Sequence, residues 1–465
     1  MLEIVPKLKG CVEHLPELFG NAFARMPYSW RGPMGRAYAN RRKEIGAFDG
    51  FDAARKRQYV LERMQSIVSF AYQNVPFYRE FYKKHAFSPT DLTDFEGISC
   101  IPIVTKAILN EVAIEERSSN RPGRYAANTG GSSGEPLGFY ITPALIPNEW
   151  AHMHTIWEKL GYRTWMLKLF FGGRNLGERT LAYDALRHQY AVNVYRPAEE
   201  VARCLRQLKA VHRIQFLHGY PSAIYDFACF CEASDPALQG ILRKSLQGVF
   251  LGSEYPALIY RDKIEKVFGV PSVSWYGHTE RSILAWERSV PFLYHPFQTY
   301  GYTEAVADSA TGRCSLVGTS YYNLASPFIR YDTGDEVEAS LGDDRLLAEF
   351  RIIGGRQGEF VVDRRGKRIP LTGLIFGRHH RAFDIARFIQ VFQSVPGKAT
   401  LLVVLLKPGG IQVSDLAGCF DTQGVDIDFS FQIVSHPVKT LRGKVCLKVE
   451  MLPLAEAGGG EQCTG

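Results

Sequence analysis

Between residues 167 and 275 the chain alternates short apolar runs with amphipathic helical segments, and this alternation constrains the fold more than any other feature. Residues 198–212 and 257–268 carry apolar side chains at helical spacing, and Gly269 is a typical stop for the second helix. The apolar runs around these helices are typical of buried strands; they lie at 167–171, 214–217, 248–251 and 270–275. Strands that alternate with helices predict a layered α/β fold.

Two further stretches indicate how the chain divides. Residues 55–74 show helical periodicity, and Val75-Pro76 is expected to end that helix. Near the C-terminus, short apolar runs alternate with Gly-rich turns, at 388–392, 400–406 and 428–434. A chain of 465 residues also exceeds one ordinary domain. We therefore predict a large multi-layered α/β domain over residues 1–353, a small mobile α+β domain over 354–454, and a disordered tail over 455–465.

Composition limits the partners that the chain is expected to have. The net charge of +7 favours anionic small molecules, but no basic segment with interleaved aromatics indicates nucleic acid. The nine cysteines include no C-x-x-C pair, which indicates reduced thiols. The longest apolar run, 399–406, is too short to span a bilayer, and the first residues lack a signal-peptide core. We expect a cytoplasmic protein without a membrane span, and no pattern indicates an oligomeric state.

The most informative motif is a segment rich in glycines and hydroxyls that begins after Asn128. It comprises Thr129, Gly130, Gly131, Ser132, Ser133 and Gly134. Glycine lets a backbone approach an anion closely, so that several N–H groups point at one phosphate, and hydroxyls add further donors. No Lys follows the last glycine, so the segment is not a Walker A loop. Taken alone, a flexible surface loop would explain the same residues.

The same segment also matches G-x-S-x-G, the nucleophile elbow of α/β-hydrolases, with Ser132 as the nucleophile. That motif needs a strong strand before it and a helix after it. Here residues 124–128 are a poor strand by pattern, and residues 139–141 show no helical period. A hydrolase is therefore a remote alternative.

Three later segments add to the glycine-rich loop. They are Tyr276-Gly277-His278-Thr279-Glu280, residues 328–335 with Tyr331-Asp332-Thr333-Gly334-Asp335, and Lys439-Thr440-Leu441-Arg442-Gly443-Lys444. Singly, each has a simple structural explanation: a helix cap, a tight turn and a solvated hairpin. Their order along the chain is more specific than any one of them.

Together the segments resemble the motifs of the adenylate-forming superfamily, which includes acyl-CoA synthetases, peptide-synthetase adenylation domains and luciferases. Gly354-Gly355-Arg356 supplies a further element of that pattern. Smaller features resemble the branch of phenylacetate–CoA ligases and CapK-type proteins of capsular polysaccharide loci; they are residues 71–78, 101–106, 218–222 and Gly252-Ser253-Glu254. Two positions depart from the family: Gln357-Gly358-Glu359 replaces the usual hinge, and Leu137 replaces a loop lysine.

The resemblance implies a ligase that uses ATP and Mg²⁺ to turn a carboxylic acid into an acyl-adenylate and passes the acyl group to an acceptor such as CoA. It implies that Thr129–Gly134 cradle the β- and γ-phosphates, Thr279 contacts the α-phosphate and Glu280 holds Mg²⁺. Tyr276 and Gly277 would lie against adenine beside Gly252, Ser253 and Glu254. Asp335 and Arg356 would bind the ribose. Lys444 would bridge the carboxylate and the α-phosphate before the small domain turns away.

Residues just before these loops are expected to line the acyl pocket. The candidates are Phe170, Phe171, His218, Tyr220, Leu251 and Trp275, and their aromatic character suits a flat acid. Each is equally explained as core. Two alternatives stay open: acyl transfer to an amine or hydroxyl in polysaccharide or secondary-metabolite biosynthesis, and a non-catalytic nucleotide-binding protein, which the presence of Lys444, Glu280 and Asp335 disfavours.

Overall fold

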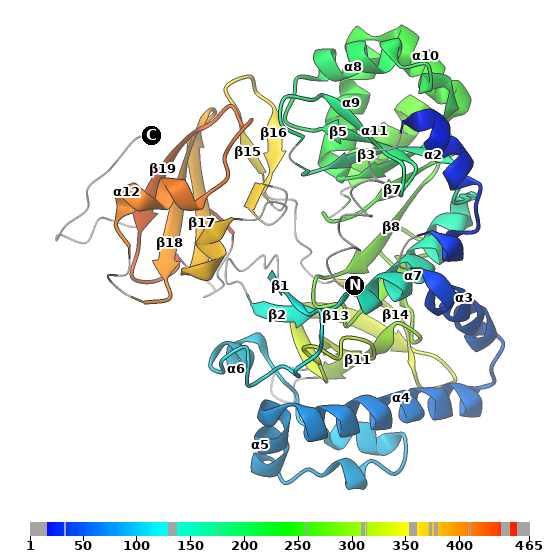
Figure 1. Cartoon of the computed structure of the whole chain (residues 1–465), viewed down its shortest axis with the longest axis vertical. Helices are drawn as coiled ribbons and strands as arrows, with labels where there is room; N and C mark the ends of the chain where they lie inside the picture. Colours follow the sequence, from blue (N-terminus) through cyan, green and yellow to red (C-terminus); the bar gives the residue numbers. More distant parts are fainter. Residues whose placement is uncertain are drawn as a thin grey trace.

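The computed structural model describes residues 16–452 apart from short gaps at 32–33, 129–136, 175, 255, 257, 308–311, 313, 353–359, 372–373, 376–379, 408, 410 and 439–446. Within these residues the chain forms one twelve-stranded mixed sheet, helices that cover it, and a separate four-stranded sheet near the C-terminus. Figure 1 shows the C-terminal sheet beside the large one, at the left of the view. The predicted α/β fold is confirmed.

The large sheet has the strand order β11-β12-β13-β14-β10-β9-β8-β7-β6-β3-β5-β4. Its bounds are β3 Leu167–Gly172, β4 Leu181–Asp184, β5 Gln189–Asn193, β6 Ile214–Gly219, β7 Gly248–Leu251, β8 Ser272–Gly277, β9 Leu284–Glu287, β10 Tyr294–Pro296, β11 Gly301–Ala307, β12 Cys314–Ser320, β13 Tyr331–Leu341 and β14 Leu347–Ile352. The strands β5, β3, β6, β7 and β8 run parallel, and all the others pair antiparallel with their neighbours.

Four helices cover one face of the parallel strands: α8 (Ala198–Gln207), α9 (Pro221–Ser234), α10 (Pro236–Ser245) and α11 (Leu258–Phe268). Figure 1 shows them grouped beside β3 and β5. Side chains alternate along each strand, so Leu167, Leu169 and Phe171 join the core beneath these helices. The other face of the sheet holds a second core around Trp157 of α7 (Ile146–Trp157). The parallel strands are therefore buried on both faces, as their continuous apolar runs predicted.

The N-terminal segment forms α2 (Glu17–Ala24), α3 (Gly35–Asp49), α4 (Ala53–Asn74), α5 (Pro76–Lys84) and α6 (Lys106–Asn110). Asp52 caps α4 by accepting a hydrogen bond from the backbone of Arg55, and Pro76 begins the next helix. The predicted helix over 55–74 and its end at Val75-Pro76 are confirmed.

The C-terminal segment contains β15 (Phe360–Val362), β16 (Arg368–Pro370), β17 (Ala386–Val395), β18 (Lys398–Leu405), α12 (Val413–Leu416), β19 (Asp428–Ile433) and β20 (Lys448–Val449). The order β19-β18-β17-β20 gives it a sheet of its own over a separate apolar core. The three strands expected near the C-terminus are confirmed. The boundary at residue 354 stays a prediction, because residues 353–359 and the tail lie outside the described residues.

Three local expectations were wrong. Residues 125–128 form a strand, β1, which pairs with β2 (Gly138–Ile141), although only one of its residues is partly buried. The helix expected over 198–212 ends at Gln207, and a short 3-10 turn follows at Val211–Arg213. The expected turn at 332–335 is a bulge inside β13, where Gly334 has a φ of 72°.

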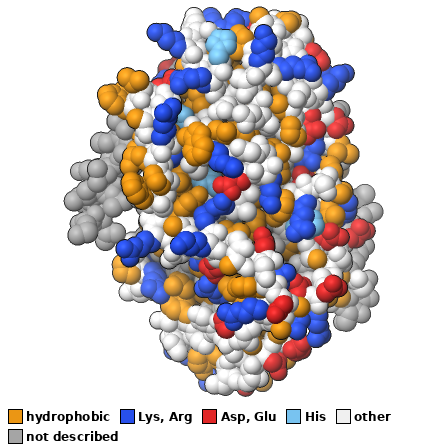
Figure 2. Space-filling view, turned by 90° about the vertical axis from the view of Figure 1, so that its right-hand side faces the viewer, with side chains coloured by type: hydrophobic (Ala, Val, Ile, Leu, Met, Phe, Trp, Pro, Cys, Tyr) orange, Lys and Arg blue, Asp and Glu red, His pale blue; other side chains and the backbone are white. Residues whose placement is uncertain are grey.

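Charged side chains of both signs mix on the visible surface. On the face shown in Figure 2, Lys and Arg side chains are interspersed with Asp and Glu, with no single basic stripe. No helix in the described part of the chain is long and apolar enough to cross a membrane.

Candidate active site

The predicted nucleotide motifs follow three neighbouring parallel strands. Because β6, β7 and β8 are adjacent and parallel, their carboxyl ends meet at one edge of the sheet. The loops that leave this edge carry Tyr220, Gly252-Ser253-Glu254, and Gly277 through Glu280. Segments about 60 residues apart in the sequence are thereby brought to one place.

Asp335 reaches this edge from a different strand. Between the pairs Ser315↔Glu336 and Val317↔Asp332, three residues of β13 stand opposite one residue of β12, which makes a bulge. The hydroxyl of Thr333 donates to the carbonyl of Leu316 at 2.8 Å and fixes the bulge. As a result Asp335 accepts a hydrogen bond of 2.7 Å from the hydroxyl of Tyr276. Asp335, predicted for the ribose, therefore lies beside Tyr276, predicted for adenine.

Glu280 is held as a buried carboxylate in the loop between β8 and β9. His278 contacts one of its oxygens at 2.9 Å, and the hydroxyl of Tyr331 donates to the other at 3.1 Å. Burial opposes ionisation, but the charge and hydrogen bond of His278, the backbone N–H of Glu280 and the charge of Lys106 outweigh it and lower the pKa of Glu280 to about 2. Thr279, by contrast, is exposed at the tip of the loop.

Glu254 lies in the loop after β7 and is held by α9, the helix that follows β6. Ser222, at the start of α9, donates its hydroxyl at 2.8 Å and its backbone N–H at 3.2 Å to one carboxylate oxygen. Burial raises the pKa of Glu254 to about 7; the bonds from Ser222 counter this, and the negative charge of Asp226 adds to it. Ser253 beside it has a φ of 68°, an uncommon backbone for a residue other than glycine.

The glycine-rich loop itself lies outside the described residues, but the strands on either side are seen. β1 and β2 pair from Tyr125↔Ile141 to Asn128↔Gly138, so residues 129–136 connect the two strands of a hairpin. The nucleophile elbow requires a helix after the serine, and here a strand follows. The hydrolase alternative is therefore wrong. Tyr125 of β1 lies near Arg281, next to Glu280.

Several predicted residues cannot be placed. Thr129, Gly130, Gly131, Ser132, Ser133, Gly134, Arg356 and Lys444 all fall outside the described residues, so their roles stay predictions.

The six acyl-pocket candidates divide between the two faces of the sheet. Phe170, His218 and Trp275 share one face; the ring centroids of Phe170 and Trp275 lie 4.9 and 5.9 Å from that of His218. Phe171 and Leu251 point to the opposite face, into the core beneath α8–α11. Tyr220 is buried at the strand end near Glu254. Phe171 and Leu251 are therefore corrected to core residues, because neighbours on a strand point in opposite directions.

Sequence reasoning did not assign Lys106, Ser222 or Arg330 to the site. Lys106 acts on Glu280 by its charge, and Ser222 holds Glu254. Arg330 is buried, pairs with Glu304 through two bonds of 2.7 and 3.0 Å, and donates to two backbone carbonyls. A signal for Ser222 was its place directly after Pro221, where a helix begins. Lys106 and Arg330 stand in the motif segments 101–106 and 328–335, but no local pattern indicated their contacts, because their partners are distant in sequence.

Magnesium is implied by the resemblance, and the donor at hand fits it. No cluster of three or more metal-binding side chains occurs among the residues that the structure places. Glu280 nonetheless offers an ionised carboxylate with one hydrogen bond to each oxygen. Mg²⁺ commonly takes one or two carboxylates together with substrate phosphates, so a single carboxylate suffices.

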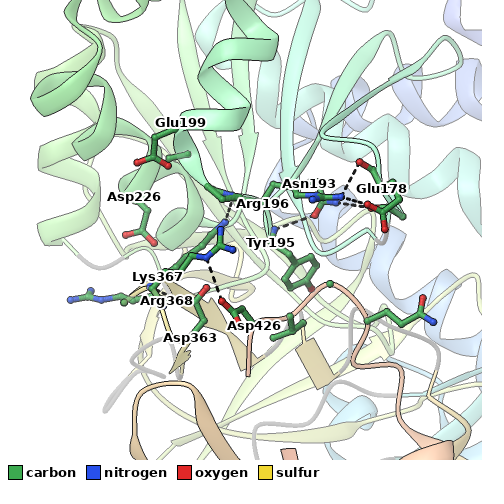
Figure 3. Close-up of a pocket in the computed structure, with 18 of the residues that line it drawn as sticks. Glu178, Asn193, Tyr195, Arg196, Glu199, Asp226, Asp363, Lys367, Arg368 and Asp426 are labelled. Carbon is green, nitrogen blue, oxygen red and sulfur yellow. Dashed lines mark hydrogen bonds and ion pairs between the residues drawn. The ribbon is translucent and has the colours of Figure 1, made fainter. Parts of the chain in front are cut away.

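A cavity of about 780 Å³ lies where the C-terminal segment meets the large sheet (Figure 3). Its walls come from α8, α9, the β15–β16 hairpin and the turn at 423–426. Lys367 of the hairpin donates to the backbone carbonyl of Arg196, which joins the two parts. Burial lowers the pKa of Lys367 to about 8 and raises that of Asp226 to about 6. Among the described residues, none of those predicted to bind the nucleotide lines this cavity.

Comparison with known proteins first defines the class. No family model matches the chain. 2-Hydroxyisobutyryl-CoA ligase, solved with 2-HIB-AMP and CoA in the thioesterification state, gives a TM-score of 0.54 at 18% identity over 86% of this chain and 91% of that one. In the postadenylation state with R3-HIB-AMP the TM-score is 0.52 at 18% identity, over 86% of this chain and 90% of that one. The chain has the fold of the adenylate-forming enzymes, which confirms the resemblance.

A particular relative agrees with this class. Protein CapK of Staphylococcus aureus is 22% identical over 325 residues, which cover 65% of this chain and 68% of CapK.

Proposed function

We propose that the chain is an AMP-forming ligase that activates a carboxylic acid with ATP and transfers the acyl group to an acceptor. The observation that carries the proposal is the convergence of Tyr276–Asp335, Glu280 and Glu254 at one edge of the sheet. These residues come from separate strands, and no structural need of the core explains three carboxylates beside the ends of parallel strands.

In the first step, an oxygen of the substrate carboxylate attacks the α-phosphorus of ATP. The new O–P bond forms as the bond to the β-phosphate breaks and pyrophosphate leaves. An anion must approach a polyanion, so positioning and neutralisation of charge are the main needs. Glu280 would hold Mg²⁺, which supplies part of that neutralisation. Asp335 would accept bonds from the ribose, with adenine against Tyr276 next to it.

In the second step, the acceptor attacks the acyl carbon, and the bond between that carbon and the phosphate oxygen of AMP breaks. AMP leaves, and the proton of the acceptor passes to solvent. We propose CoA as the acceptor, so that the product is a thioester. Support comes from 2-hydroxyisobutyryl-CoA ligase, which shares the fold and was solved with CoA. Transfer to an amine or hydroxyl is the second candidate. Lys444 would serve the first step and leave before the second.

An exchange assay with a matched pair of variants tests the proposal. ATP–pyrophosphate exchange is measured over a panel of carboxylic acids, and the products formed with CoA or amines are identified by mass spectrometry. Asp335→Asn should lower kcat/KM for ATP on the order of ten- to a hundredfold, because hydrogen bonds to a charged group are lost. Asp343→Asn, at an exposed aspartate beyond the same strand, should leave exchange unchanged. Equal exchange in both variants would refute the assignment of Asp335.

A further inference from the structure

Two buried polar atoms have no hydrogen-bond partner near the edge where the site lies. They are Nδ1 of His218 and Nε1 of Trp157, and no described residue bonds to either. The two rings lie 4.8 Å apart between centroids, so the atoms belong to one cluster. Buried polar atoms are normally paired in folded proteins, because leaving them unpaired costs free energy. A group from outside the described chain is therefore expected to pair with them.

Aromatic rings surround this pair of atoms, and Trp157 itself is buried. Phe170 and Trp275 flank His218, and all three side chains keep part of their surface exposed. Glycines make room for both flanking rings: a Cβ on Gly172 would lie 2.3 Å from the ring of Phe170, and one on Gly252 would lie 2.2 Å from that of Trp275. The rings thus fold over the ends of β3 and β7, at the edge that carries Glu254.

His218 differs from the buried histidines that serve the core. Both nitrogens of His152 are bonded, one to the carbonyl of Asn148 and one to Thr299, and His154 is bonded to Tyr38. Burial, with the nearby positive charge of Lys168, lowers the pKa of His218 to about 3, so the ring is neutral and offers one donor and one acceptor. Trp157 offers a donor only.

We propose that His218 and Trp157 select the acid: the substrate is a flat aromatic carboxylic acid that carries an oxygen substituent, such as a hydroxyl, away from its carboxyl group. The oxygen would accept from the indole N–H of Trp157 and exchange a hydrogen bond with His218, while Phe170 and Trp275 would hold the ring. This inference rests on the proposed function, and it names the substrate class for the same site. Sites that bond a substrate hydroxyl reject analogues that lack it.

Matched acids test the inference. Adenylation kcat/KM is measured by ATP–pyrophosphate exchange for benzoate against meta- and para-hydroxybenzoate, phenylacetate against the hydroxyphenylacetates, and cinnamate against the coumarates. The wild-type protein should favour the hydroxylated member of at least one pair by roughly three- to tenfold or more. His218→Phe should bring that ratio to about one, and His218→Asn should keep part of it. His212→Phe, the same change at an exposed histidine six residues earlier, should keep the wild-type ratio.

The outcomes separate this inference from the proposed function. The inference is wrong if the wild-type protein turns over both members of every pair equally, or if His218→Phe keeps the preference. In either case Nδ1 of His218 and Nε1 of Trp157 do not recognise the oxygen substituent of the substrate. If no aromatic acid is activated, the substrate class is also wrong, whereas exchange with aliphatic acids would still uphold the ligase. If the wild-type protein shows no exchange with any acid, both the inference and the proposed function are wrong.

Discussion

Glu254 is a carboxylic acid held where water is scarce, and its bonds to Ser222 only partly compensate for burial. Glu280, one strand away, is also buried, but the charges of His278 and Lys106 keep it ionised. Two carboxylates at one edge therefore have opposite pKa shifts. Such a difference separates a group that holds a cation from one that stays protonated near neutral pH.

The raised pKa of Glu254 predicts a pH-dependent effect on stability. Between the ordinary value of 4.5 and about 7 the folded protein binds a proton that the unfolded chain has released, so this residue costs stability as the pH rises through 7. Glu254→Gln removes that cost, and at pH 8 it should raise the free energy of unfolding on the order of 1–3 kcal/mol, with no gain at pH 4. Urea unfolding at both pH values measures it. Glu338→Gln, at an exposed position, is the control; a loss of stability at pH 8 in the Glu254 variant contradicts the account.

At the scale of the element, the bulge of β13 decides where Asp335 lies. Gly334 has open space around its Cα but a φ of 72°, so the backbone and not the packing requires glycine there. The bonds from Thr333 to Leu316 and from Gly334 to Asp332, at 2.8 and 2.9 Å, hold the shape. The bulge thus interrupts the regular pairing of β13, so that the carboxylate of Asp335 meets Tyr276.

Gly334→Ala tests the bulge. The left-handed backbone should cost about 1–2 kcal/mol of stability, or the bulge should relax and move Asp335 away from Tyr276. If the bulge relaxes, the KM for ATP should rise more than the KM for the acid, as measured by exchange kinetics. Gly240→Ala, in the middle of α10 with ordinary helical backbone and free space, is the matched control and should stabilise the protein slightly. Unchanged stability and ATP kinetics in Gly334→Ala would contradict the role of the bulge.

Sequence periodicity predicted those elements whose apolar pattern faces a core. β7 is buried along its whole length and its predicted bounds are confirmed, as is α4 with its apolar stripe. α7 escaped notice because it buries Asn148, His152 and His154 among its apolar residues. β1 escaped because its order comes from pairing with β2, since its side chains are mostly exposed.

The candidate site was predictable only where one short segment carries it. The loops after β7 and β8 were found by their motifs, and their meeting follows from the parallel order of the strands. The link between Tyr276 and Asp335 depends on the bulge, which no pattern shows. Phe170 and Phe171 could have been separated from the sequence, because successive side chains of a strand point to opposite faces of the sheet. The sequence analysis did not use this alternation.

At the scale of the whole molecule, two sheets with separate cores meet around a charged cavity. The bond from Lys367 to the carbonyl of Arg196 is one contact that must break if the C-terminal segment turns. 2-Hydroxyisobutyryl-CoA ligase has been solved in a postadenylation and a thioesterification state. We propose a similar alternation here, with Lys444 delivered to the α-phosphate in one arrangement only.

Lys444→Ala tests the alternation by its effect on the two half-reactions. The variant should fold and bind ATP, but pyrophosphate release should fall roughly a hundred- to thousandfold, because one charge contact in the transition state is lost. Transfer from a chemically supplied acyl-adenylate should remain close to the wild-type rate. Equal losses in both steps, with the fold intact, would rule out the alternation, and no loss in either would refute the role of Lys444.

We propose that this chain cleaves ATP at the α-phosphate to activate a carboxylic acid. The most direct measurement follows both nucleotide and phosphate products by chromatography during turnover with an acid that supports exchange. We expect AMP and pyrophosphate in equal amounts, formed only when the acid is present and reduced in the Asp335→Asn variant. Release of ADP and inorganic phosphate would contradict it.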